Sequence, residues 1–246
     1  MNDNKQGAQV RFGTTRWSVV LRAGAAASDE TRDALNELIA AYWYPLYAFS
    51  RRCGNSHHDA LDLTQGFFAH LLQGQALGSV SPDKGRFRSF LLASFKNFMA
   101  NQSRAAATLR RGGSVNTISL NDADFRSRYD REPAVNETPE LLFERSWVAE
   151  LLTRVRARLA DEYQQAGKQE LFEFLEPHLA SCREATSRAE ICTRLNLSAA
   201  ALAMSIHRMR RRYGELLREE VAATVDDPAH VDEELHTLMA LVGPTG

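Results

Sequence analysis

Two blocks of this chain carry side chains that suit nucleic acid, and the first lies between Lys84 and Arg111. It holds seven Lys or Arg residues and no Asp or Glu, with phenylalanines and amides interleaved. Unpaired bases stack on aromatic rings while their phosphates need cations, so this composition suits single-stranded DNA. Phe87, Leu91 and Phe98 are expected to be core instead. The polar positions expected to contact nucleic acid are Asn97, Asn101, Gln102 and Arg104.

The second block runs from Ser198 to Arg218 and holds five Arg against one Glu. It follows a short helical segment and the turn Asn196-Leu197-Ser198, and this order predicts a helix-turn-helix. A helix fits the major groove, where residues near its N-terminus meet base edges. Arginines farther along would pair with phosphates and release counterions. The alternative is an ordinary basic helix face in contact with solvent.

The other reactive residues form no recognisable catalytic or metal-binding set. Asp59 and Asp62 are three residues apart with no further catalytic group nearby, so a solvated or partner-facing edge is expected. His57 and His58 are adjacent and point to different sides of a helix, and Cys53 lies beyond a glycine turn. No glycine-rich phosphate loop, nucleophile elbow or paired-histidine zinc motif occurs. We therefore expect no enzyme activity, no cofactor and no metal.

Helices must position these residues, because apolar side chains recur at spacings of three and four over most of the chain. Pro45 lies inside the first helical run and is expected to kink it. Ser56 to Asp59 and Ser187 to Glu190 have capping-box form. The expected helices begin near Asp29, Ser56, Asp83, Thr138, Leu171, Ser187, Ser198 and Ala229.

The predicted fold class is all-α, with two helical modules joined by a flexible linker. The first module covers residues 28–111 and the second 138–221, with the helix-turn-helix at 187–218. Residues 112–137 mix Gly, Ser, Asn, Asp and Arg without an apolar period and are interpreted as the linker. Residues 1–27 are interpreted as an N-terminal extension. Residues 222–246 are interpreted as a C-terminal extension; from Glu219 onward there are seven acidic residues and no Lys or Arg.

Bulk properties fit a reduced, cytoplasmic protein. The net charge is −1, so composition alone gives no nucleic-acid signal. Three widely spaced cysteines argue against a disulfide framework. The first eleven residues have no apolar core of a secretory signal. No stretch approaches the ~18 apolar residues of a membrane-spanning helix, so membrane insertion is not expected.

The order of motifs resembles bacterial sigma factors of the extracytoplasmic-function type. Residues 59–68, DALDLTQGFF, are similar to their region 2.2, and residues 87–101, FRSFLLASFKNFMAN, to regions 2.3 and 2.4. Residues 189–198, AEICTRLNLS, followed by Ile206 to Arg210, resemble region 4.2. The opening Thr15-Arg16-Trp17-Ser18-Val19 and the acidic tail are similar to a subgroup with terminal extensions. The resemblance covers roughly residues 30–108 and 138–220.

The resemblance implies a non-catalytic factor that binds core RNA polymerase and promoter DNA, with an anti-sigma factor or other regulator as a further partner. Residues 74–82 would shape the pocket for an extruded base of the −10 element. The positions implied to bind polymerase are Asp59, Asp62 and Gln65. Those implied to bind the −10 element are Lys96, Asn97, Asn101, Gln102 and Arg104. Those implied to bind the −35 element are Ser198, Ala200, Ala203, Ser205, His207, Arg208, Arg210 and Arg211.

The chain also departs from the family. Ala199, Ala200, Ala201 and Ala203 stand where polar or basic residues are usual, so specificity at −35 is expected to depend on phosphate contacts and DNA shape. Phe90 replaces the usual Trp of region 2.3. The acidic helix at 229–242 is expected either to fold onto a basic surface of the second module, to bind a regulator, or simply to be solvated. The alternative function is a stand-alone helix-turn-helix transcriptional regulator.

Overall fold

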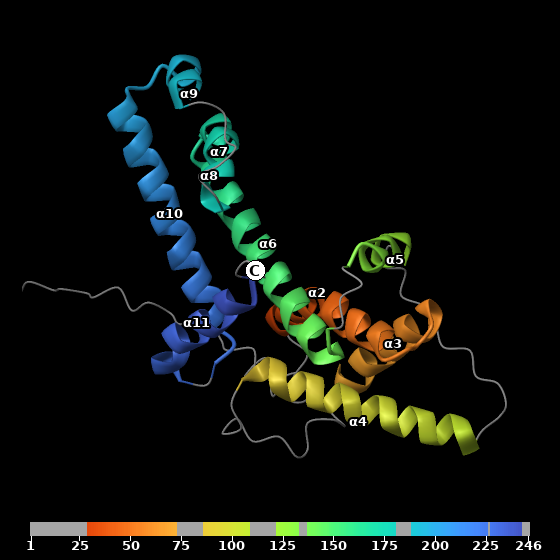
Figure 1. Cartoon of the computed structure of the whole chain (residues 1–246). Coiled ribbons are helices and arrows are strands. Elements are labelled where there is room, and N and C mark those ends of the chain that lie inside the picture. The colour runs from red at the N-terminus through yellow and green to blue at the C-terminus, as the bar shows by residue number, and fades with distance from the viewer. Residues whose placement is uncertain are drawn as a thin grey trace, which may run out of the picture. The chain divides into compact units, whose positions relative to one another are not determined.

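The computed structural model describes residues 29–72, 86–108, 122–132, 137–180, 188–225 and 227–242. Every regular element in those residues is helical and none is a strand, which confirms the all-α prediction (Figure 1). No helix there is both long and apolar enough to cross a membrane. The N-terminal extension, the 74–82 loop and the Ser187 cap lie outside the described residues.

Contacts divide the chain into two compact units. Unit 1 comprises Met1–Pro133 and Ala222–His230, and unit 2 comprises Ala134–Val221 and Val231–Gly246. The division falls inside the segment interpreted as a linker. It also splits residues 222–246, which the sequence suggested as one extension, between the two units.

Unit 1 begins with α2 (Asp29–Arg52), which continues through Pro45. The helix ends at Arg52, and Gly54, two residues later, has a φ of +95°, which lies in the left-handed region that glycine adopts readily. Ser56 then precedes α3 (His57–Leu72), and its hydroxyl accepts a bond from the Asp59 amide. The same hydroxyl donates to the Asp59 carboxylate at 2.6 Å. The expected capping box is therefore present in modified form, with the acid bound to the Ser side chain.

The core of unit 1 is built mainly from aromatic rings of α2, α3 and α4 (Phe87–Thr108). Phe67 of α3 meets Phe95 of α4 with ring centroids 5.1 Å apart, and Phe49 of α2 meets Phe95 at 6.2 Å. A methyl group at Gly66 would lie 3.4 Å from Phe98, so glycine there leaves room for that ring. The largest fully buried side chains of unit 1 are Tyr42, Tyr44, Tyr47, Phe49, Phe67, Phe87 and Phe95.

A short helix, α5 (Asp122–Asp130), lies in the segment from which no helix was expected. Phe125 packs 6.3 Å from Tyr44 and 5.9 Å from Tyr47, between ring centroids, and Tyr129 also meets Tyr47. Tyr44 donates a hydrogen bond of 2.8 Å to the Glu132 carboxylate just beyond the helix. These contacts bury aromatic surface and explain why a segment with no regular apolar period folds as a helix.

The connection after α10 also belongs to unit 1. Thr224 is buried, and its carbonyl accepts a bond of 3.2 Å from the Phe87 amide, the first amide of α4. Amides in the first turn of a helix have no partner within the helix, so this carbonyl acts as a cap. The segment interpreted as an appended tail therefore helps to define where α4 begins.

The described part of unit 2 has two long helices, α6 and α10, with shorter helices between and after them. In chain order these helices are α6 (Pro139–Gln165), α7 (Gln169–Leu175), α8 (Pro177–Ala180), α9 (Arg188–Leu195), α10 (Ala199–Ala222) and α11 (Val231–Val242). The Thr138 hydroxyl accepts from the Leu141 amide and Pro139 occupies the first turn, so α6 begins where the sequence predicted a helix start. The α11 helix packs against α6 and buries Val231 and Leu238.

Candidate nucleic-acid interface

The first candidate surface lies along α4 in unit 1. Phe87, Leu91 and Phe95 are fully buried on one side of the helix. The positions expected to bind nucleic acid are all exposed: Lys96, Asn97, Asn101, Gln102 and Arg104. Asn97, Asn101 and Arg104 follow one another at spacings of four and three, which places them along one stripe. The α4 helix contains no acidic residue.

Two details of α4 refine the sequence interpretation. Phe98 was expected to be core but is only half-buried, because it lies at the edge of the α3–α4 contact against Phe67 and His70. The Lys96 ammonium lies 5.5 Å from the centroid of the Phe49 ring. Its charge therefore rests partly over an aromatic face while the residue remains exposed.

The second candidate surface is the α9–turn–α10 segment of unit 2. Asn196 has a φ of +51°, a left-handed conformation that Asn tolerates better than most residues. The Leu197 amide donates back to the Cys192 carbonyl at 2.9 Å, closing the turn. Ser198 then caps α10 by accepting from the Ala201 amide at 3.2 Å. The expected turn and the helix start expected at Ser198 are therefore confirmed.

The α9 helix is fixed to the rest of unit 2 by two kinds of contact. Ile191 is fully buried. Arg194 places its guanidinium 5.0 Å from the centroid of the Phe174 ring on α7, a cation–π distance. The α10 helix buries one face, formed by Leu202, Ile206, Met209, Leu216, Leu217 and Val221.

Most of the predicted −35 contacts lie on the opposite, exposed face of α10 or at its cap. Exposed residues are Ser198, Ala200, Ala203, His207, Arg208, Arg210 and Arg211. Ser205 is half-buried, and its hydroxyl donates to the Ala201 carbonyl one turn earlier at 2.9 Å. Ser205 is therefore directed along its own helix.

The arginines of α10 differ sharply in their surroundings. Arg210 donates two bonds, of 3.0 and 2.7 Å, to the His178 carbonyl in α8. Arg211 pairs with Glu215 one turn away at 3.0 Å. Arg208 is exposed and has no hydrogen bond or ion pair with any described residue. Arg208 is thus the arginine of this cluster whose charge is most available to a phosphate.

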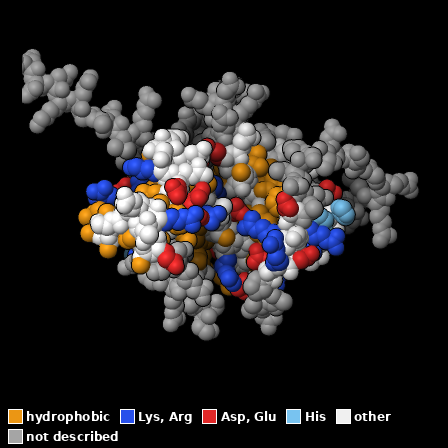
Figure 2. All heavy atoms as spheres, turned by 90° about the horizontal axis from the view of Figure 1, so that it is seen from above, with side chains coloured by type: hydrophobic (Ala, Val, Ile, Leu, Met, Phe, Trp, Pro, Cys, Tyr) orange, Lys and Arg blue, Asp and Glu red, His pale blue; other side chains and the backbone are white. Residues whose placement is uncertain are grey.

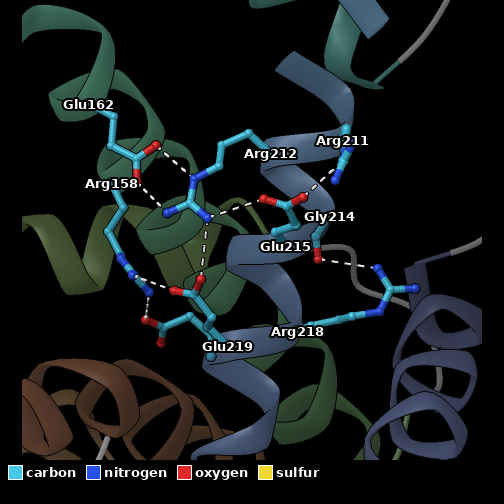
Figure 3. A network of polar contacts seen from close by, with 9 residues as sticks. Arg158, Glu162, Arg211, Arg212, Gly214, Glu215, Arg218 and Glu219 are labelled. Carbon is cyan, nitrogen blue, oxygen red and sulfur yellow. Dashed lines mark hydrogen bonds and ion pairs between the residues drawn. The ribbon is translucent and has the colours of Figure 1, made fainter. Parts of the chain in front are cut away.

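Arg212 is the centre of an ion-pair network between α10 and α6 (Figure 3). Its guanidinium donates to both carboxylate oxygens of Glu162, at 2.7 and 2.9 Å, and also to Glu215 and Glu219. Arg158 of α6 pairs with Glu219 and Glu220. Arg158 precedes Glu162 on α6, but its partners Glu219 and Glu220 follow Arg212 on α10. The two helices are therefore antiparallel.

The network shifts the proton affinities of its members. The hydrogen bonds from Arg212 hold the pKa of Glu162 below its ordinary value, outweighing the opposing effect of burial. The same bonds raise the pKa of Arg212. The i,i+4 pair of Arg211 and Glu215 could have been read from spacing. The cross-helix partners were missed, because Glu162 and Arg212 are 50 residues apart and no local pattern links them.

The residues expected to face a polymerase lie on α3. Asp62 is exposed, Gln65 is half-buried, and Asp59 is exposed but bound to Ser56 at the helix start. Ala60, Phe67 and Leu71 are buried on the same helix. Of the two acidic residues, Asp59 is engaged in the cap at the start of α3, whereas Asp62 is not.

The His57 ring, considered as a metal ligand from the sequence, is engaged elsewhere. Its Nδ1 atom lies 2.8 Å from the Tyr47 hydroxyl oxygen, and the two share a hydrogen bond. Within the part of the chain that the structure describes, no group of three His, Cys, Asp or Glu side chains could hold a metal ion.

The two surfaces offer binding chemistry, namely cations, amides and a capped helix end. Among the described residues in view in Figure 2, Lys and Arg side chains are interspersed with Asp and Glu. Local availability of each charge therefore matters more than the number of basic residues. No family model, curated protein or solved structure matches this chain.

Proposed function

We propose that this chain is a sigma factor of the extracytoplasmic-function type, which binds core RNA polymerase and directs it to promoters. The observation that carries the proposal is that one chain has two exposed candidate surfaces, each in its own unit. One is the acid-free stripe of α4, and the other is the capped α10 helix of a helix-turn-helix. A regulator that only reads duplex DNA has no need for the first surface. The sequence resemblance assigns the same two segments to promoter binding.

In this proposal α4 holds the unpaired strand of the −10 element. Asn97 and Asn101 offer amide donors and acceptors to base edges, and Lys96 and Arg104 offer charge to phosphates. All four side chains are exposed on a helix fixed by buried rings, so little ordering is required on binding. The α10 helix would enter the major groove at the −35 element, with Arg208 on a phosphate.

The polymerase would dock on the exposed edge of α3 through Asp62 and Gln65, by helix-on-helix recognition. The proposed factor acts in the cytoplasm and has no catalytic activity of its own. It lends specificity to the enzyme that it binds.

The first test is capture of bacterial core RNA polymerase by the purified full-length chain. We expect the wild type to bind and the Asp62→Ala/Gln65→Ala double variant to bind more weakly. A matched control is Asp161→Ala/Gln164→Ala, which removes an exposed Asp and Gln with the same spacing from α6. The control should bind like the wild type. A wild type that binds duplex DNA but no polymerase would instead indicate a stand-alone helix-turn-helix regulator.

The second test addresses the α4 surface. With core polymerase present, the Asn97→Ala/Asn101→Ala variant should bind a single-stranded promoter-strand oligonucleotide several-fold more weakly, because each stacked or bonded base contributes measurably. Ser89→Ala, which alters an exposed position nearer the start of the same helix, is the control. Equal loss in both variants would argue for a general effect on α4 and against direct strand contact.

A further inference from the structure

The exposed face of α10 begins apolar and becomes cationic toward the C-terminus. Ala200, Ala203, His207 and Arg211 follow one another at spacings of three, four and four, and Met204 lies four residues after Ala200 and three before His207, so the five share one face. All five are exposed, and Met204 is 50% exposed. This face lies opposite Leu202, Ile206 and Met209, which are buried. Its apolar start is therefore not used by the core.

The polar groups near the start of α10 are directed into the helix itself. The Ser198 hydroxyl accepts from the Ala201 amide as the cap. The Ser205 hydroxyl donates to the Ala201 carbonyl. The first two turns consequently present methyl and thioether groups outward and no side-chain hydrogen-bond donor. These turns of a helix-turn-helix are the ones that meet base edges.

A surface of this kind matches one feature of the major groove. Among the four bases, only thymine exposes an apolar group there, its C5-methyl, and alanine side chains commonly contact it. Placing the same surface on a guanine or cytosine edge would remove water from polar atoms without replacing their hydrogen bonds, which is unfavourable. Methionine adapts its shape easily and increases the apolar contact.

We propose that Ala200, Ala203 and Met204 select thymine methyl groups in duplex DNA, so that this chain reads its −35 element by apolar contact. The proposal rests on the proposed function. Arg208 holds the adjacent phosphate, since it has no partner among the described residues. Arg211 assists, because its pair with Glu215 is solvent-exposed and therefore weak enough to exchange for a phosphate.

The experiment uses the full-length chain assembled with core RNA polymerase. Duplexes with a randomised upstream segment are prepared in two versions, one with thymine and one with uracil, which lacks only the methyl group. We expect selection from the thymine pool to enrich T at defined positions. Replacing each such thymine by uracil should weaken binding about fourfold, the factor for losing one buried methylene-sized group.

The variant Met204→Ala should reduce the preference for thymine over uracil while retaining general duplex binding through Arg208. The control Met239→Ala removes the same type of side chain from α11, where Met239 is 40% exposed, and should leave the preference for thymine unchanged.

The outcomes separate the two proposals. Failure of the chain to assemble with core polymerase overturns the proposed function and, with it, this inference. A complex that forms and binds promoter DNA, but binds thymine and uracil duplexes equally, overturns only the apolar readout. A thymine preference that Met204→Ala and Met239→Ala reduce equally would overturn the assignment to this face of α10.

Discussion

The two units fix their candidate binding helices by different forces. In unit 1, α4 is held by ring contacts such as Phe67 with Phe95, and the buried side chains are largely aromatic. In unit 2, α10 also buries apolar residues, but its middle and end are joined to α6 by Arg–Glu pairs. Apolar burial depends little on salt, whereas exposed ion pairs are screened.

This difference also changes what remains for a ligand. The α4 helix uses rings for packing, so its cations and amides stay outside and no acid on that helix opposes them. The α10 helix uses Arg210 and Arg212 to hold neighbouring helices, which leaves Arg208 as the exposed arginine without a described partner. A count of basic residues therefore overstates the charge that α10 offers to DNA.

The largest expected effect is on the aromatic core. Phe67→Ala removes a fully buried ring that meets Phe68, Phe95 and Phe98. We expect the free energy of unfolding to fall by about 3–5 kcal/mol in a urea titration. Phe90→Ala, at a half-buried position on α4, is the control and should cost clearly less. Equal losses would mean that this core does not depend on the α3–α4 ring contact.

Tyr44→Phe should have the next largest effect, because it removes the bond from a buried hydroxyl to the Glu132 carboxylate. A hydrogen bond to a charged group contributes about 1.5 kcal/mol, measured as the loss of unfolding free energy at pH 7. Burial, with help from Glu132, raises the pKa of Tyr44 far above its usual value. The Tyr44 hydroxyl therefore contributes fully to the free energy of unfolding below about pH 10, where the unfolded chain still keeps this proton. This contribution is lost as the pH rises further.

In Tyr44→Phe this alkaline loss should be smaller than in the wild type. Tyr129→Phe is the matched control, since no hydrogen bond of its hydroxyl is found among the described residues. An alkaline profile that is the same in Tyr44→Phe and the wild type would contradict the role of this hydroxyl.

Arg212→Met tests the ion-pair network of unit 2. The loss of unfolding free energy should be about 1 kcal/mol, because the side chain is 36% exposed and solvent screens its pairs. The loss should shrink in about 1 M salt, where the screening length is about 3 Å. Arg208→Met removes the same charge and should barely change stability. In a DNA-binding assay we expect the opposite ranking, with Arg208→Met weakening binding more than Arg212→Met. If Arg212→Met had the larger effect in both assays, the division between structural and binding arginines would be refuted.

The smallest expected effect is on the loss of folding stability at acidic pH. The folded pKa of Glu162 is lowered by Arg212, so its stabilisation is present above the unfolded pKa of about 4.5 and is lost as the pH falls through the folded pKa. Between pH 6 and 3, Glu162→Gln should therefore lose less stability than the wild type. Asp161→Asn, at the neighbouring exposed position, should follow the wild type. Thermal unfolding across this pH range measures both.

Local sequence determined much of the molecule. Caps and turns act over three or four residues, so Thr138-Pro139 and the Asn196–Ser198 turn predicted helix starts that the structure has. The period of apolar residues predicted the buried face of α10, with Leu202, Ile206 and Met209. The exposure of the polar residues on α4 followed from the same period.

Tertiary structure decided the rest, because it depends on which distant segments meet. No apolar period predicted α5, and this helix gains its stability from contacts of Phe125 and Tyr129 with Tyr44 and Tyr47 on α2. Likewise, only the antiparallel approach of α6 and α10 brings Glu162 to Arg212 and thereby removes that arginine from the basic cluster. Helix formation is governed by neighbours in sequence, whereas the availability of a charge is governed by neighbours in space.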